Sequence, residues 1–386
     1  PAGSALPNPP TTNSFTVNVF HRYAYIPDIA AGGIQVIDTG ESSTAPSKVT
    51  TITQSNIQGS VAVTPDGNYA IAPLTASNGF AAIDTITGAE LPKSPFTFPA
   101  GATCTAPVGV AFSPDSTKAY FACSGNSEVV EIDISQIGGS AGKITAVASS
   151  STTASAPAAI AVTPDGASVY VVTAGASPQL LIYSAASLST APTSIPLAAG
   201  VTPVAIALAG SSPTYAYIAE QESGSPGQVD VYYSGSGKLL APPVTFAAAK
   251  VSGTTYNPEP SCLAVTPDGA RVYVGLQGTD EFAEINAGTS TQVTGSPFLL
   301  PSAASGTNTT IGASSPNGVA IPPLDSLPSK GYRVFFTSVN AGNGEVDIID
   351  DNKGGAPLLD ATTPSLSFGT TSTPQGISNI PIPTAQ

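Results

Sequence analysis

Apolar residues recur along this chain in a two-strand pattern that is clearest between residues 260 and 275. There, Leu263–Val265 is a short apolar run, Thr266–Gly269 is a polar stretch, and Val272–Val274 is apolar and aromatic again. Proline and glycine in the polar stretch favour a tight turn, because proline presets φ and glycine accepts a positive φ. β-Branched and aromatic residues on both sides favour strands. The pattern therefore predicts a β-hairpin.

The same hairpin pattern is repeated from one end of the chain to the other. Copies of decreasing clarity lie at residues 157–172, 58–72, 107–122, 203–218, 316–336 and 14–26. The central apolar residues of the first strands are spaced by 46 to 58 residues, at Phe15, Val61, Val110, Ile160, Ile206, Leu263, Val319 and Ile377. A period of this size indicates a repeat architecture.

Each hairpin is followed by a third strand-like segment and by a weaker fourth one. The third segments are Gly33–Asp38, Phe80–Asp84, Val129–Asp133, Leu180–Tyr183, Val229–Tyr233, Phe282–Asn286 and Val346–Asp350. Four antiparallel strands in each of seven units predict an all-β fold, a seven-bladed β-propeller formed as one domain by residues 14–386. Residues 1–13 are rich in Pro, Ser and Thr without periodicity, which predicts an N-terminal tail.

Two columns of the repeat support this fold. Alanine recurs between larger apolar residues of the first strand, which suits blades that crowd together at a central axis; the column is Ala62, Ala111, Ala161, Ala207, Ala264 and Ala320. An aromatic column in the second strand is expected to pack between blades, and its members are Tyr25, Tyr120, Tyr170, Tyr217, Tyr273 and Phe335. For both columns a role in the core is predicted, because both faces of each blade are buried.

The repeat count does not close at the ends of the chain. Eight segments resemble a first strand, whereas a ring of seven blades has seven places. We expect Gly376–Ile382 to close the first blade as a terminal strand and to displace Ser14–Val19. The displaced strand then has three alternatives: it adds to an outer blade edge of the same molecule, it stays disordered together with residues 1–13, or it pairs with an edge strand of a neighbouring subunit. The last alternative predicts self-assembly into a surface filament or array.

The motifs resemble a known family. The stretch 157–172, PAAIAVTPDGASVYVV, and Val129–Asp133, VVEID, are similar to the YVTN-type β-propeller repeat of bacterial and archaeal surface proteins, which is related to the lactonase-like seven-bladed propellers. The resemblance covers residues 14 to about 383 and departs from the repeat in the turns at Val19–His21 and Ala209–Ser212. It implies the fold and says little about activity, since propellers host many functions.

The amino-acid composition argues against two classes of binding partner, nucleic acid and anionic membranes. Charged residues make up 9% of the chain and the net charge is −14, so no basic stripe is available for nucleic acid or for an anionic membrane surface. No apolar run reaches 18 residues, which predicts no transmembrane segment. Scarce lysine, a pI near 4.2 and a first residue other than methionine are interpreted as the mature form of a secreted or cell-surface protein.

Candidate catalytic chemistry is sparse. His21 is the single histidine, and no Cys-x-x-Cys, phosphate-binding glycine loop or EF-hand spacing occurs. The resemblance implies that a lactonase would use His, Glu and Arg around its channel. The arginines here, Arg22, Arg271 and Arg333, each lie at a hairpin and are interpreted as solvated turn charges. A quinone cofactor is not predicted, because the chain has no tryptophan on which it would stack.

Four acidic residues form the best candidate binding site. Glu220 and Glu222 follow the second strand of the fifth repeat, and Asp280 and Glu281 occupy the matching loop of the sixth. Loops of adjacent blades emerge on one face of a propeller, so these carboxylates are candidates to lie close together and to hold calcium. The alternative is a set of solvated loop charges. No other cofactor is predicted.

Three cysteines complete the candidate chemistry. The hairpin of the third repeat is expected to bring Cys104 and Cys123 together as a disulfide, with Cys262 buried and free; the alternative is three small buried side chains. The sequence as a whole predicts a non-catalytic extracellular scaffold or binding module that meets a protein or glycan surface, or itself as a homo-oligomer. The alternative is a lactonase-like hydrolase with a rearranged site.

Overall fold

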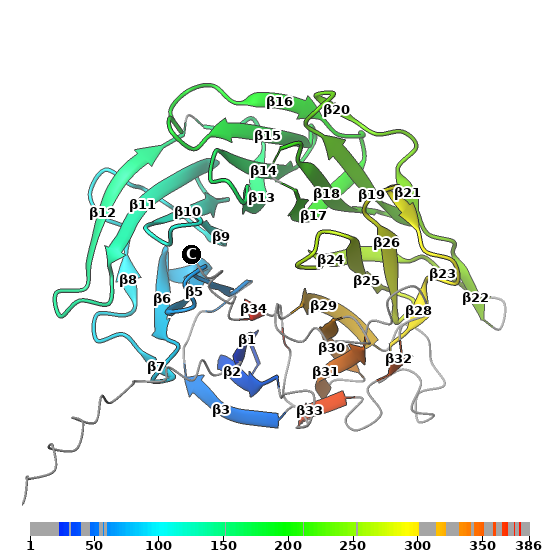
Figure 1. The fold of residues 1–386 in the computed structure, drawn as a ribbon, viewed down its shortest axis with the longest axis horizontal. Helices are drawn as coiled ribbons and strands as arrows, with labels where there is room; N and C mark the ends of the chain where they lie inside the picture. Colours follow the sequence, from blue (N-terminus) through cyan, green and yellow to red (C-terminus); the bar gives the residue numbers. More distant parts are fainter. Residues whose placement is uncertain are drawn as a thin grey trace, which may run out of the picture.

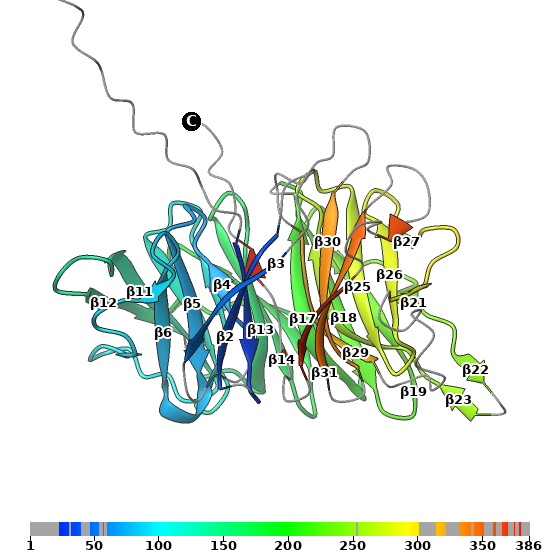
Figure 2. The same ribbon diagram turned by 90° about the horizontal axis from the view of Figure 1, so that it is seen from below.

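The chain forms a ring of seven blades around a central axis, as a computed structural model shows (Figure 1). The structure describes residues 23–30, 32–39, 47–53, 57, 60–150, 152–210, 212–251, 254–300, 314–321, 332–340, 343–350, 358–359, 365–369, 374 and 378–379. Seen from the side, the ring is a disc whose strands run across its thickness (Figure 2). The predicted all-β, seven-bladed architecture is confirmed.

Four layers of strands succeed one another from the axis to the rim in each blade. The innermost strands of blades 1 to 7 are β34 (Ser378–Asn379), β4 (Ala62–Val63), β9 (Pro107–Phe112), β13 (Ala156–Val162), β17 (Val201–Ala209), β24 (Glu259–Val265) and β29 (Ser314–Ala320). The second strands are β1 (Tyr23–Asp28), β5 (Tyr69–Leu74), β10 (Lys118–Cys123), β14 (Ser168–Ala174), β18 (Tyr215–Glu222), β25 (Arg271–Gln277) and β30 (Arg333–Asn340).

The third and outer strands complete the blades. The third strands are β2 (Gly33–Asp38), β6 (Gly79–Asp84), β11 (Glu128–Gln136), β15 (Gln179–Ser184), β19 (Ser225–Tyr233), β26 (Glu281–Asn286) and β31 (Asn343–Asp350). The outer strand is continuous in β3 (Ser47–Thr53), β12 (Lys143–Ser149) and β16 (Thr193–Pro196). In the other blades it is split into β7 (Ala89–Glu90) and β8 (Phe96–Thr97), β20 (Lys238–Leu239) and β21 (Val244–Thr245), β27 (Thr291–Gln292) and β28 (Phe298–Leu299), and β32 (Leu358–Leu359) and β33 (Ser365–Gly369).

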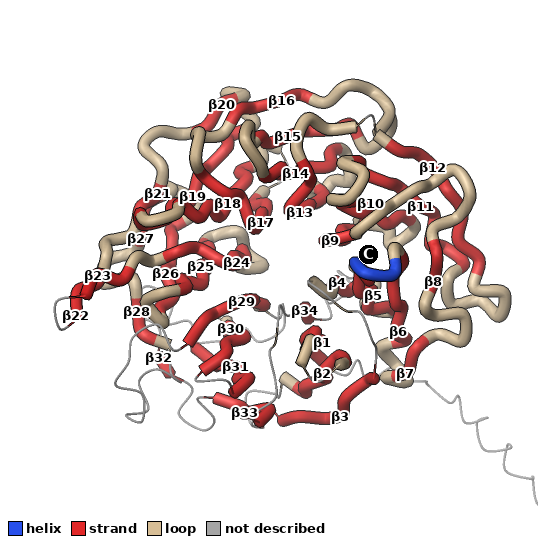
Figure 3. The backbone as a smooth tube through the Cα atoms, turned by 180° about the vertical axis from the view of Figure 1, so that it is seen from behind, coloured by secondary structure: helices blue, strands red, loops and turns tan. Residues whose placement is uncertain are grey.

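The described residues also form a short 3₁₀ turn and an additional hairpin outside the seven blades. A 3₁₀ turn, η1 (Thr75–Ser77), joins the second and third strands of blade 2 (Figure 3). The hairpin of β22 (Ala249–Val251) and β23 (Thr254–Tyr256) projects from the rim between blades 5 and 6 (Figure 1). Among the residues that the structure describes, none form a helix with the length and apolar character needed to span a bilayer.

The Thr-Pro-Asp-Gly turn of the sequence repeat has one local geometry wherever it is complete. In blade 6 the Thr266 hydroxyl donates to Asp268 Oδ1 at 2.6 Å, and Gly269 has a φ of +69° while its N–H donates to the Thr266 carbonyl. Only glycine adopts that conformation without strain. Blades 2 and 4 repeat the Thr–Asp hydrogen bond at Thr64 and Thr163. The hydroxyl bond also lowers the pKa of Asp165.

The core lies between blades. All six residues of the predicted aromatic column are at most 3% exposed, as is Ile71 at the same place in blade 2, which confirms their assignment to the core. Apolar clusters join each blade to the next; one of them packs Phe80 and Phe96 of blade 2 against Phe121 of blade 3. Both faces of the blades are therefore used for packing, which leaves the strand ends and the rim for interactions.

Ring closure is by the C-terminal strand. β34 pairs antiparallel with β1, with Tyr25 opposite Ser378, and occupies the innermost position of blade 1. The prediction that Gly376–Ile382 supplies this strand is confirmed for Ser378 and Asn379. Ser14–Val19, the N-terminal tail of residues 1–13, and the turn at Val19–His21 lie outside the described residues.

Candidate functional site

The innermost strands enclose a central channel with a cavity of about 370 Å³. Five of these strands have a proline among their first three residues and bulge directly after it, since the pairing register with the second strand shifts by one residue there. A bulge leaves one residue out of the ladder and re-aims its side chain. The bulged residues are Val108, Ala158, Val204, Ser261 and Asn317, and all five line the channel.

Small, apolar and neutral side chains form the wall of this channel. It comprises Ser60, Val61, Ala62, Val108, Gly109, Val110, Ala158, Ala159, Ile160, Val204, Ala205, Ile206, Ser261, Cys262, Leu263, Asn317, Gly318 and Val319. None of these lining residues carries a charged side chain. A wall without charged side chains favours an uncharged ligand over an anionic one, because burying a charge without a partner is costly.

The polar groups of the wall are used to join blades. The Ser261 hydroxyl donates to the Gly275 carbonyl at 3.2 Å and to the Pro316 carbonyl of blade 7. Asn317 accepts a hydrogen bond of 2.6 Å from Gln277 of blade 6 and donates one of 3.2 Å to the Pro374 carbonyl. These side chains therefore tie the last two blades together across the channel wall.

Cys262 is a free, buried thiol in the same wall, as expected from the sequence. Burial raises its pKa to about 12. The thiolate is the nucleophilic form of cysteine, so this thiol is not activated for catalysis at neutral pH. His21, the single histidine, and Arg22 lie outside the described residues.

The four predicted acidic site residues occupy two places. Glu220 is fully buried in β18, and Glu222 is exposed at the end of that strand, opposite Ser225. Asp280 is buried in the turn before β26; burial, with a smaller contribution from the Asp280 charge, raises the pKa of neighbouring Glu281. Within the described ranges no three His, Cys, Asp or Glu side chains are grouped to hold a metal ion.

The carboxyl group that accompanies Glu220 is instead Asp230 of β19. Gln228 Nε2 lies between them and donates to Glu220 Oε2 at 2.9 Å and to Asp230 Oδ1 at 3.3 Å. The other oxygen of Glu220 is buried and accepts no hydrogen bond from the described residues. Burial, with a contribution from the Asp230 charge, raises the pKa of Glu220 to about 8, and burial also raises that of Asp230.

This acidic pair belongs to a recurring position of the propeller. Glu220 is the sixth residue from the start of its second strand, and the equivalent residues of blades 1 and 7 are Asp28 and Ser338. Each contacts a polar residue of the third strand: Asp28 accepts from Gln35 at 3.1 Å, and Ser338 donates to Asp347 at 2.9 Å. Sequence reasoning missed these pairs, although the aspartate inside VDVYY and VDIID was a usable signal.

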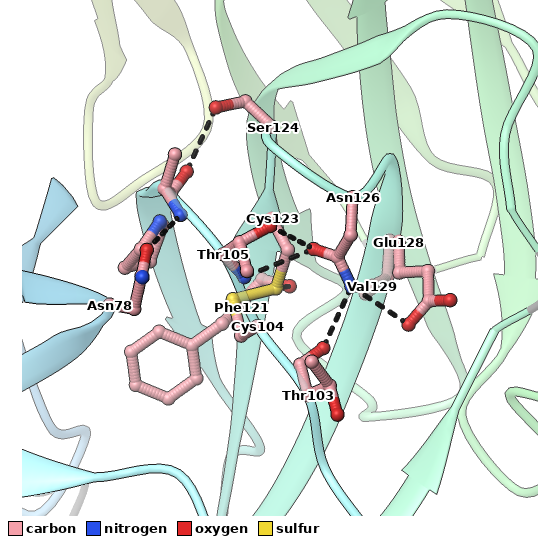
Figure 4. The surroundings of a disulfide bond; sticks show 12 residues. Asn78, Thr103, Cys104, Thr105, Phe121, Cys123, Ser124, Asn126, Glu128 and Val129 are labelled. Atoms are coloured by element: carbon pink, nitrogen blue, oxygen red, sulfur yellow. Dashed lines mark hydrogen bonds between the residues drawn. A yellow bond between two sulfur atoms is a disulfide. The ribbon is translucent and has the colours of Figure 1, made fainter. Parts of the chain in front are cut away.

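In blade 3 the same position carries a disulfide. Cys123 is the sixth residue of β10, and the structure joins it to Cys104, with a Cα–Cα distance of 5.2 Å that suits such a bond (Figure 4). Asn126 holds the strand that leads to Cys104 in place, since its Oδ1 accepts from the Thr105 N–H at 3.1 Å and its Nδ2 donates to the Thr103 carbonyl at 2.8 Å.

Removing this disulfide is expected to destabilise the protein by about 3 kcal/mol, the loop-closure value for a loop of roughly 20 residues. The bonded residues are 19 positions apart in sequence. Denaturant unfolding of the wild type with and without a reductant, compared with the Cys104→Ala/Cys123→Ala double variant, measures the effect. The double variant should not respond to reductant. A free thiol at either cysteine in peptide maps of the unreduced protein would contradict the pairing.

The interpretation of the arginines as solvated turn charges is wrong for two of them. Arg271 and Arg333 are not solvated turn charges, because each forms an ion pair at the junction of the second and third strands. Arg271 Nη1 lies 2.5 Å from Oε1 of fully buried Glu284, and Arg333 Nε lies 3.2 Å from Asp350 Oδ1. Lys118 forms the corresponding pair with Glu131 in blade 3 at 2.7 Å. These ion pairs join the second and third strands of their blades, and their residues are not among those that line the channel cavity.

Comparison with known proteins places the chain by its fold. No protein-family model matches it, and no curated protein matches it in sequence. A solved structure from Lactobacillus plantarum matches with a TM-score of 0.66 and 14% identity over 93% of this chain and 99% of that one. The periplasmic gluconolactonase PpgL of Pseudomonas aeruginosa matches with a TM-score of 0.63 and 15% identity, over 94% of this chain and 99% of that one. A putative 6-phosphogluconolactonase of Bacteroides uniformis matches with a TM-score of 0.65 and 14% identity, over 94% of this chain and 100% of that one. At these identities the likeness is one of architecture: the chain shares the seven-bladed β-propeller fold of these structures.

Proposed function

We propose that this protein is a non-catalytic scaffold or binding module of the cell exterior. The observation that carries the proposal is the channel wall: every described lining residue is neutral, and the polar side chains of Ser261 and Asn317 are hydrogen-bonded between blades. Lactone or ester hydrolysis requires a group that activates water and a group that stabilises negative charge. The described wall has a concave surface of uncharged side chains, which is suited to binding a partner and supplies neither of these groups in charged form.

An extracellular site of action is supported by the blade 3 disulfide, since disulfides persist in oxidising compartments. Few charges and a net charge of −14 suit partners other than nucleic acid, namely a protein or glycan surface or a further copy of the chain. Closure of the ring by β34 leaves the first-strand segment Ser14–Val19 without its usual place, which supports self-assembly through a terminal strand as the form that the scaffold takes.

The second candidate function is a lactonase-like hydrolase with a rearranged site. Two observations favour it: the names of two structural neighbours, and the raised pKa of Glu220, a property that catalytic acids share. Against it, the Glu220 side chain is enclosed between strands and is fully buried, so a substrate has no route to its carboxyl group.

A screen of lactones and esters separates the two candidates. We expect no turnover above the uncatalysed rate, measured by release of acid at constant pH. Turnover that is abolished in the His21→Ala or Glu220→Ala variant, and retained in the matched surface variant Glu222→Ala, would reverse the order of the two functions.

A further inference from the structure

The rim of the disc has two long strands whose outer edges pair with no other described strand; these are called open edges below. β3 of blade 1 and β12 of blade 3 are continuous over seven residues each and end their sheets. In blades 2, 5 and 6 the outer strand is split by proline, at Pro95, Pro242 and Pro297. Proline lacks an N–H group, so it interrupts a row of pairing groups and protects an edge from other chains.

Of the two open edges, β3 is the less covered. All of its residues except Ile52 are exposed, whereas in β12 exposed residues alternate with residues packed on the blade. The sequence SKVTTIT of β3 is rich in β-branched residues, which favour extended pairing. Its one charged residue, Lys48, lies 5.7 Å from the centre of the Phe368 ring in blade 7. β3 lies at the rim of the disc (Figure 1), and little in its sequence opposes the addition of another strand.

The chain also contains a segment with the sequence pattern of an innermost strand, in addition to the seven innermost strands that the structure describes. Residues 14–20, SFTVNVF, are a copy of the innermost strand, and that position is held by β34. The segment is uncharged, and Phe15, Val17 and Val19 alternate with Thr16 and Asn18, the period of a strand with one apolar face. We propose that residues 14–20 of a second copy add to the open edge of β3 by antiparallel strand pairing.

Pairing with a second copy uses the edge more fully than pairing within one molecule. A strand added beside β3 lies three strand spacings, about 14 Å, from β1, which begins at Tyr23. At most ~3.6 Å per residue, about four residues are needed to cross that distance, so only about five of residues 14–20 would remain to pair within the same molecule. A second copy can align all seven with β3.

In this contact the donor is the segment of residues 14–20 and the acceptor is the edge of β3. Because these are different surfaces of the chain, the contact is heterologous. Repetition of such a contact gives a closed ring or an open filament. The inference rests on the proposed scaffold function and specifies its partner as the chain itself. The two fail separately: lactone turnover would overturn the non-catalytic role, and the assembly experiment below addresses the strand contact.

The test compares full-length protein with four variants by sedimentation velocity and negative-stain electron microscopy over a range of concentrations. Deletion of residues 1–20, or Val17→Lys with Val19→Lys in the full chain, removes the donor. Val49→Lys places a charge on β3, where Val49 is 48% exposed, and Val147→Lys places the same charge on β12, where Val147 is 49% exposed. Unchanged circular dichroism and melting show that each variant is folded.

We expect assemblies from full-length protein and from Val147→Lys, and loss of the assembled fraction in both donor variants and in Val49→Lys. A peptide of residues 14–20 in excess should also dissociate the assemblies. Full-length protein that stays monomeric, or a truncated form that assembles equally well, overturns the proposal. Loss of assembly in Val147→Lys alone overturns the assignment of β3 as the acceptor.

Discussion

The Arg271→Met variant is expected to lose about 3–5 kcal/mol of unfolding free energy, the cost of removing one partner from a buried ion pair. Arg271 Nη1 lies 2.5 Å from Glu284 Oε1, and the Glu284 side chain is fully buried in β26. Methionine keeps the aliphatic stem of arginine, so the loss reports the missing cation more than missing packing. Chemical denaturation at neutral pH measures it.

Two controls isolate the role of the charge. The double variant Arg271→Met/Glu284→Gln removes both charges and should recover most of the loss, because an uncharged pair costs less to bury. Lys118→Met removes the partner of Glu131, but the Lys118 side chain is 38% exposed, so water screens this pair and a smaller loss is expected. Equal losses for Arg271→Met and Lys118→Met would contradict the argument from burial.

A second large effect is expected at alkaline pH for Glu220→Gln. The pKa of Glu220 in the folded protein is raised from 4.5 to about 8, so the folded state binds its proton more tightly than the unfolded state does. The cost of burying the carboxylate is absent below pH 4.5, grows as pH rises toward 8, and is complete above 8. Glutamine does not titrate, so the variant escapes this cost.

The expected gain is on the order of 4 kcal/mol at pH 9 and close to zero at pH 4.5, since each pKa unit corresponds to about 1.4 kcal/mol. Urea denaturation of wild type and variant across this range measures it. Glu222→Gln is the matched control, because Glu222 lies on the same strand and is exposed. Parallel stability curves for wild type and Glu220→Gln would show that Glu220 does not bind a proton more tightly on folding.

Much of the architecture follows from the sequence alone, because its signals are local and repeated. The Thr-Pro-Asp-Gly turn forms its own hydrogen bonds within six residues, as at Thr266 and Asp268, so it marks a hairpin wherever it occurs. Repeated units of four antiparallel strands then indicate a closed ring of blades. The buried aromatic column, including Tyr120 and Tyr217, was predictable for the same reason.

Only the tertiary structure decided which side chains meet. Glu220 and Glu222 are two residues apart, yet one is buried beside Asp230 and the other is exposed, because the strand continues past the point that sequence reasoning took as its end. Arg271 resembles a turn charge in sequence, and its ion pair with Glu284 forms because β25 and β26 align Tyr273 with Glu284. Local sequence determines hairpins; cross-strand register, set by the packing of whole blades, determines the chemistry of the sites.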